Sequence, residues 1–170
     1  PYFEETIYVT PSRLPKGTRD LIFDCANRTF NALGLRQGPV HTEFRINDGG
    51  IWPIEAAARS IGGLCSRTLQ FETRRSLEEL ILLNALESDE LTHQVESSAA
   101  GVMMLPIPSS GVLKEVRGQN EALAVEGIED LVILIPQGKE ITPLPEGTRY
   151  LGFLFSRADT PAEAEAALRK

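Results

Sequence analysis

Apolar residues recur at three- and four-residue spacing in the segment after the first loop. From Thr18 onward they are Ile22, Cys25, Ala26, Thr29, Phe30 and Leu33. This spacing places side chains on one face of a helix, and Gly34 is well placed as its C-terminal cap. The segment therefore predicts a helix with one buried face. The preceding residues from Phe3 to Thr10, rich in β-branched and aromatic side chains, predict a strand that ends at Pro11.

A strictly alternating pattern covers residues 40–47. Thr42, Phe44 and Ile46 fall on one side, and the polar residues His41, Glu43, Arg45 and Asn47 fall on the other. Alternation of this kind predicts a half-buried strand. The sequence IWPIEA follows after Asp48, Gly49 and Gly50, so the two segments predict a β-hairpin whose register depends on the length of its loop.

The hydrophobic pattern favours a three-residue loop. A two-residue loop of Asp48 and Gly49 would set Phe44 opposite Pro53 and Glu43 opposite Ile54, which mixes polar and apolar side chains on both faces. A three-residue loop gives one apolar face and one polar face. Its expected pairs are Phe44 with Ile54, Ile46 with Trp52, Glu43 with Glu55, and His41 with Ala57.

Opposed glutamates need compensation, because directly facing residues have Cβ atoms about 4.5 to 5.5 Å apart and like charges there are destabilising. A divalent cation would supply it, and Mg²⁺ is commonly held by one or two carboxylates plus substrate phosphates. Arg59 could neutralise or bind an anion beside the metal, while Gly62 and Gly63 let the backbone approach a ligand. The alternative is a solvated hairpin face on which Glu43 and Glu55 pair with Arg45 and Arg59.

The remaining pattern predicts an α+β protein with two parts. The sequence SLEEL predicts a second helix with a capping box between Ser76 and Glu79. An acidic, polar stretch follows, and beyond it short strand-like runs separated by Gly and Pro predict a small β-rich lobe. A final helix begins after Thr160, with Pro161 and Glu163 as its start signals. We expect an antiparallel sheet with helices in residues 1–97 and the β-rich lobe in residues 98–170.

Composition excludes several classes of function. The chain has 170 residues, 42% of them hydrophobic, and a net charge of −7, with its seventeen Lys and Arg residues scattered. We therefore expect no nucleic-acid partner. The apolar runs are too short or too interrupted to cross a bilayer, so we expect no membrane partner. Two cysteines make neither a disulfide framework nor a zinc site, which favours a cytoplasmic setting.

The segment GPVHTEFRINDGGIWPIEAAARSIGG resembles the ATP-grasp ligases, in particular the branch with L-amino acid ligases and biotin carboxylase-like proteins. It has their order of a strand with an acid, a turn, a second strand with another acid, and an arginine four residues later. The resemblance implies that Glu43 and Glu55 bind Mg²⁺ bridging the phosphates of ATP. It also implies that Arg59 contacts the transferred phosphate or an acyl phosphate. His41, on the same face, could touch substrate or could have a structural role.

The resemblance implies an ATP-dependent ligase that joins a carboxylate to an amine. One position departs from the family pattern, because Ala57 replaces the asparagine that usually supplies a third metal ligand. Two other functions therefore stay open: a biotin carboxylase-like enzyme, and a non-catalytic binding or assembly module that kept the fold. The adenine-binding segment and phosphate-contacting lysines of the family are expected in a preceding part of the same protein, without which these residues should be inactive. A homo-oligomer is also possible.

Overall fold

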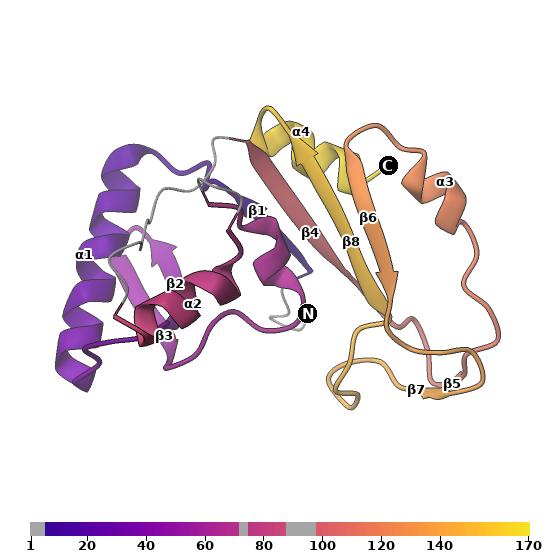
Figure 1. The fold of residues 1–170 in the computed structure, drawn as a ribbon, viewed down its shortest axis with the longest axis horizontal. Coiled ribbons are helices and arrows are strands. Elements are labelled where there is room, and N and C mark those ends of the chain that lie inside the picture. Colours follow the sequence, from indigo (N-terminus) through magenta and orange to yellow (C-terminus); the bar gives the residue numbers. More distant parts are fainter. Residues whose placement is uncertain (1–5, 72–74, 88–97) are drawn as a thin grey trace. The chain divides into compact units, whose positions relative to one another are not determined.

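The computed structural model describes residues 6–71, 75–87 and 98–170 (Figure 1). The chain forms two compact units. One comprises Pro1–Pro11 and Ser97–Lys170, and the other comprises Ser12–Glu96. The two units divide beside residue 97, where the sequence predicts a domain boundary, but the first eleven residues group with the later unit. The assignment of residues 1–97 and 98–170 as domains stays a prediction.

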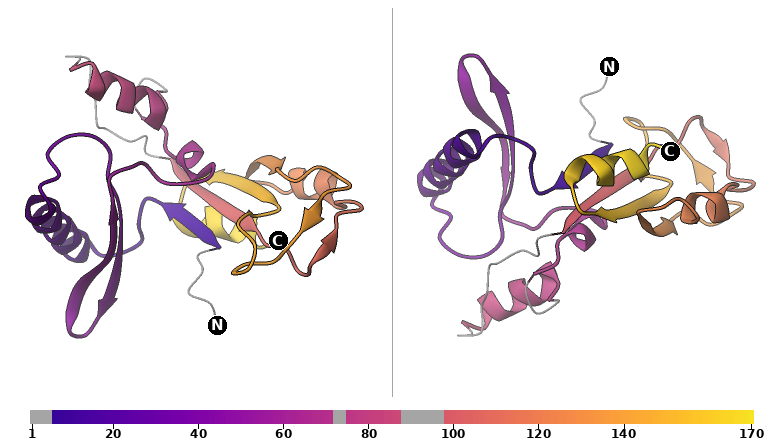
Figure 2. Two further views of the ribbon diagram at one scale, coloured as in Figure 1. Left: turned by 90° about the horizontal axis from the view of Figure 1, so that it is seen from below. Right: turned by 90° about the horizontal axis from the view of Figure 1, so that it is seen from above.

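The unit that contains the C-terminus is built on a four-stranded antiparallel sheet. Strand β1 (Ile7–Thr10) pairs with β4 (Ala99–Leu105), β4 pairs with β8 (Gly152–Ala158), and β8 pairs with β6 (Ile128–Ile133). The predicted strand start at Phe3 lies outside the described residues. Helix α4 (Pro161–Leu168) packs against β4, β8 and β1 (Figure 2). Its predicted capping box is confirmed, because the Thr160 side chain accepts from the Glu163 N–H and the Glu163 carboxylate accepts from the Thr160 N–H.

A smaller apolar cluster supports the rest of this unit. Buried Ile107, Leu113 and Ile135 form it, next to a two-stranded ribbon of β5 (Gly111–Val112) and β7 (Glu140–Ile141). The short helix α3 (Gln119–Leu123) precedes β6. These elements confirm the β-rich lobe that the short apolar runs predict.

The other unit combines two helices with a hairpin. Helix α1 (Lys16–Leu33) ends at Gly34, whose φ of 72° is left-handed, as the predicted cap requires. It packs against β3 (Gly50–Ala57), which forms a hairpin with β2 (His41–Asn47) (Figure 2). Cys25 and Ala26 are the buried residues of the helix. Leu33 departs from the predicted buried face, since it is 58% exposed. The helix thus supports the hairpin that carries the predicted site.

Helix α2 (Leu77–Ala85) follows the short 3₁₀ helix η1 (Cys65–Thr68) in the same unit. The predicted capping box between Ser76 and Glu79 is present in both directions. The buried Ser66 hydroxyl donates to the Glu78 carboxylate at 2.6 Å, which ties η1 to the first turn of α2. This hydrogen bond lowers the pKa of Glu78 below its usual range.

Candidate functional site

The turn of the hairpin differs from the one that the hydrophobic pattern predicts. Asp48 and Gly49 form a two-residue turn, because Asn47 pairs with Gly50. Asn47 stabilises the turn by accepting the Gly49 N–H on its side-chain oxygen at 2.9 Å. The expected three-residue loop is therefore wrong, and the Asp-Gly sequence, a common two-residue turn, was the stronger signal.

The predicted pairing of the two glutamates is nevertheless confirmed. Glu43 lies opposite Glu55 and His41 lies opposite Ala57, while the register shifts between Glu43 and Phe44. Phe44 pairs with Pro53, so Ile54 is an extra residue on β3. A bulge of this kind sets two residues of one strand against one of the other. It restores the register that the shorter turn would otherwise have lost.

The bulge also changes which apolar residues share the face of the two glutamates, which we call the carboxylate face. Trp52 pairs with Arg45 rather than with the predicted Ile46, and Ile46 pairs with Ile51. Paired residues in an antiparallel sheet project to the same side. Trp52 therefore lies on the carboxylate face, and its side chain is 53% exposed. The predicted pairs of Phe44 with Ile54 and Ile46 with Trp52 are wrong for this reason.

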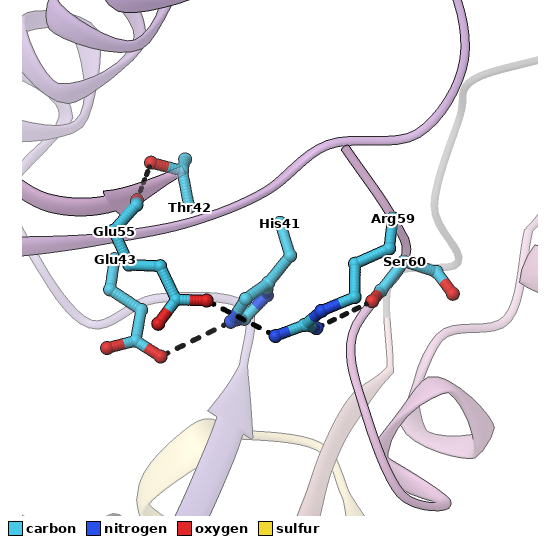
Figure 3. Close-up of polar contacts among 6 residues, drawn as sticks. All are labelled: His41, Thr42, Glu43, Glu55, Arg59 and Ser60. Carbon is cyan, nitrogen blue, oxygen red and sulfur yellow. Dashed lines mark hydrogen bonds and ion pairs between the residues drawn. The ribbon is translucent and has the colours of Figure 1, made fainter. Parts of the chain in front are cut away.

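Each glutamate of the carboxylate face has a basic partner (Figure 3). His41 Nε2 is 3.4 Å from Glu43 Oε1, and Arg59 Nη2 is 3.2 Å from Glu55 Oε1. The His41 and Glu43 side chains are 15% and 29% exposed, whereas Arg59 and Glu55 are about half exposed. The structure thus brings together four of the predicted site residues. The Arg59 contact is also the one that a purely structural ion pair would make.

Thr42 is a member of the site that sequence reasoning missed. Its hydroxyl donates to the backbone carbonyl of Glu55 at 2.7 Å, next to the bulge (Figure 3). The bond fixes the backbone from which the Glu55 carboxylate projects. Alternation alone assigns Thr42 to the apolar side of β2, so no sequence signal indicated this contact.

The segment after β3 carries the other predicted residues. Arg59 also donates to the carbonyl of Ser60 at 3.0 Å, so its guanidinium bridges the hairpin and the following turn. Gly62 and Gly63 are exposed, and Gly63 has a left-handed φ of 62°. A Cβ at Gly62 would meet nothing within 4 Å, so the structure leaves room beside this backbone.

The chemistry of the carboxylate face fits Mg²⁺. Two opposed carboxylates match the one or two that proteins usually provide to this ion together with substrate phosphates. A cation between them would also relieve the repulsion of like charges. Within residues 6–71, 75–87 and 98–170, no group of three or more His, Cys, Asp or Glu side chains is placed to hold a metal. Mg²⁺ commonly completes its coordination with water and phosphate oxygens.

Comparison with known families agrees with the sequence resemblance over both parts of the chain. The ATP-grasp domain family matches residues 1–68. The family described as L-amino acid ligase C-terminal domain 2 matches residues 103–170. The carboxylate face lies within the first of these matches.

Individual proteins also resemble this chain, in sequence or in fold. The L-amino acid ligase from Bacillus licheniformis is 30% identical, with a TM-score of 0.82 over 99% of this chain and 43% of its own. A Hydrogenobacter thermophilus biotin carboxylase domain, solved with MgADP and bicarbonate, shares the fold at a TM-score of 0.66 and 16% identity, over 98% of this chain and 38% of its own. An uncharacterized protein of Sinorhizobium fredii, y4rH, is 25% identical over 100% of this chain and 36% of its own length.

The chain therefore spans well under half the length of these relatives. Their agreement confirms the α+β fold of an ATP-grasp protein. Across the part of the chain that the structure describes, none of the helices has the length and apolar character needed to span a membrane.

Proposed function

We propose that this chain, whose residues 1–68 match the ATP-grasp domain family, supplies the magnesium-binding acids of an ATP-dependent carboxylate-amine ligase. In this reaction ATP phosphorylates the carboxylate, and the amine then displaces phosphate from the acyl phosphate. The observation that carries the proposal is the opposition of Glu43 and Glu55 across a bulged hairpin. Because of the bulge, Glu43 and Glu55 face one another although the turn has only two residues, and a divalent cation between the two carboxylates would relieve their mutual repulsion.

The residues of the carboxylate face have distinct proposed roles. Glu43 and Glu55 would hold Mg²⁺, which would supply neutralisation of charge on the phosphates. Arg59, which contacts the Glu55 carboxylate in the structure, would bind the transferred phosphoryl group. His41 orients Glu43 and faces the reacting groups. Gly62 and Gly63, which are exposed residues, would let backbone N–H groups approach the nucleotide.

We assign the rest of the nucleotide site to another part of the same protein. This chain spans 43% of the L-amino acid ligase and 36% of the S. fredii relative, which supports such a division. We therefore expect these 170 residues by themselves not to turn over ATP. We also propose a cytoplasmic enzyme that can form a homo-oligomer, as the biotin carboxylase domain, described as a dimer, does.

Amino acids are the proposed substrates, because the relative with 30% identity is an L-amino acid ligase. Bicarbonate is the competing acid, supported only by likeness of fold to a biotin carboxylase domain. The non-catalytic module has its own supporting observation, since Ala57 lies opposite His41 where the family pattern has an asparagine.

Substrate-dependent release of ADP from the complete protein tests the reaction. We expect ADP release with pairs of amino acids in the presence of Mg²⁺, and none with the 170-residue chain. Release that requires bicarbonate instead would replace the ligase with a carboxylase-like enzyme. No release with any acid, from protein that binds Mg·ATP, would favour the non-catalytic module.

A further inference from the structure

Trp52 occupies a position on the carboxylate face that the roles above leave unexplained. It is the only tryptophan of the chain, and its cross-strand partner is Arg45. It precedes Glu55 by three residues on β3, so it is up to about 10 Å from Glu55 along the strand at the usual rise per residue. The proposed metal and this aromatic side chain thus share one face but lie well apart.

The indole ring is fixed although it is half exposed. Its Nε1 donates to the side-chain oxygen of Asn47 at 3.2 Å. A Cβ at Gly49 would be 3.9 Å from Trp52 Cζ2, so the ring reaches the turn of the hairpin. Because Asn47 also accepts the Gly49 N–H, a single amide holds both the turn and the ring. The ring loses little freedom when a ligand covers it.

A nucleotide whose phosphates meet a metal at Glu43 and Glu55 carries its base at the far end of the molecule. An indole ring offers a flat apolar surface, and stacking of a base on an aromatic side chain tolerates any base. The guanidinium of Arg45, the cross-strand partner of Trp52, is a second planar group of the kind that stacks on rings.

We propose that Trp52 is a contact for the base of the nucleotide and thereby sets part of the affinity for ATP. This inference rests on the proposed function, because it takes the metal position from Glu43 and Glu55. It adds a binding residue that the opposed acids and Arg59 do not supply. Asn47 acts through Trp52 and is a positioning residue for the ring.

The test compares two probes on the complete protein, Mg·ATP and Mg·tripolyphosphate, because only the first has a base. Trp52→Leu should raise the dissociation constant for Mg·ATP about tenfold, as loss of one stacking contact does, and leave that for tripolyphosphate unchanged. Trp52→Phe should restore most of the affinity. The fluorescence of Trp52 is obtained as the difference between wild type and Trp52→Phe. This signal should change when Mg·ATP is added and should not change with Mg·tripolyphosphate.

A matched control is Phe23→Leu, which removes an aromatic side chain that is 69% exposed on α1. It should leave both dissociation constants unchanged. If Trp52→Leu weakens the binding of both probes equally, or weakens the binding of neither, the role of Trp52 is overturned while the metal site stands. If wild-type protein binds neither probe, the proposed function fails, and this inference fails with it.

Discussion

Glu43 and Glu55 face one another across the hairpin, and each has a basic side chain within 3.4 Å. The two pairs differ in exposure, because His41 and Glu43 are largely covered while Arg59 and Glu55 are half exposed. An exposed ion pair contributes about 0 to 1 kcal/mol, so the Arg59 contact adds little to stability. Its guanidinium can therefore leave Glu55 for an anionic ligand at small cost.

Glu78 provides a test of a single hydrogen bond in the unit that carries the site. Donation from Ser66 lowers the pKa of Glu78, so the bond contributes stability at pH values above the pKa of the unfolded state. That contribution is lost as the pH falls through the folded-state pKa. Glu78→Gln should lower stability by about 1 kcal/mol at pH 7, and the difference from wild type should shrink on acidification.

Thermal unfolding of both proteins between pH 7 and pH 3 measures this effect. Ser66→Ala removes the donor and should remove the largest share of the pH-dependent difference, because the backbone N–H of Glu78 and the Ser76 side chain also lower the pKa of Glu78. A melting-temperature difference between Glu78→Gln and wild type that stays constant over the whole range would mean that the hydrogen bond does not favour the charged form.

At the scale of the elements, the bulge in β3 decides the geometry of the site. Sequence alternation predicts which β2 residues share a face, because that depends only on the period of a strand. The pairing with β3 depends also on the turn and on any extra residue. A two-residue turn with an inserted Ile54 and a three-residue turn without it both place Glu43 opposite Glu55. The pattern therefore predicts the glutamate pair correctly and the neighbouring pairs wrongly.

Helix ends were more predictable than strand pairs. The caps at Gly34, Ser76 and Thr160 involve residues within a few positions of one another, so the local sequence specifies them. Trp52 could not be assigned to the carboxylate face, because its side depends on the bulge. Asn47 directly before Asp48-Gly49 favours the observed two-residue turn, whereas the hydrophobic pattern favours a three-residue loop.

Thr42 tests whether the backbone at the bulge matters for the metal. Thr42→Val keeps the shape of the side chain and removes its hydrogen bond to the Glu55 carbonyl. We expect a loss of stability of about 1 kcal/mol and a several-fold higher Mg²⁺ requirement for turnover, because Glu55 is held less firmly. Thr42→Ser retains the hydroxyl and should behave like wild type. An unchanged Mg²⁺ requirement in Thr42→Val would limit the hydrogen bond to folding.

At the scale of the whole chain, the first strand joins elements that are distant in sequence. Strand β1 pairs with β4, about ninety positions later, so β1 belongs with the sheet of the C-terminal unit. Periodicity predicts both strands but carries no information on such a pairing. The α+β class and the β-rich lobe were predictable because they follow from the elements themselves.

The most direct measurement of the central claim is Glu55→Gln in the complete protein, with turnover at saturating Mg²⁺ and the metal-free melting temperature recorded together. The substitution keeps the shape of the side chain and removes one of two opposed charges. If Glu55 binds the metal, turnover falls steeply. The metal-free protein then keeps its stability or gains up to about 1 kcal/mol from relief of repulsion.

The matched control is Glu115→Gln, which breaks an exposed ion pair with Arg117 of 2.7 Å in the other unit. It should change neither quantity. If Glu55→Gln instead leaves turnover nearly intact and lowers the melting temperature, then Glu55 is the structural partner of Arg59, and the assignment of Glu55 as a metal ligand is contradicted.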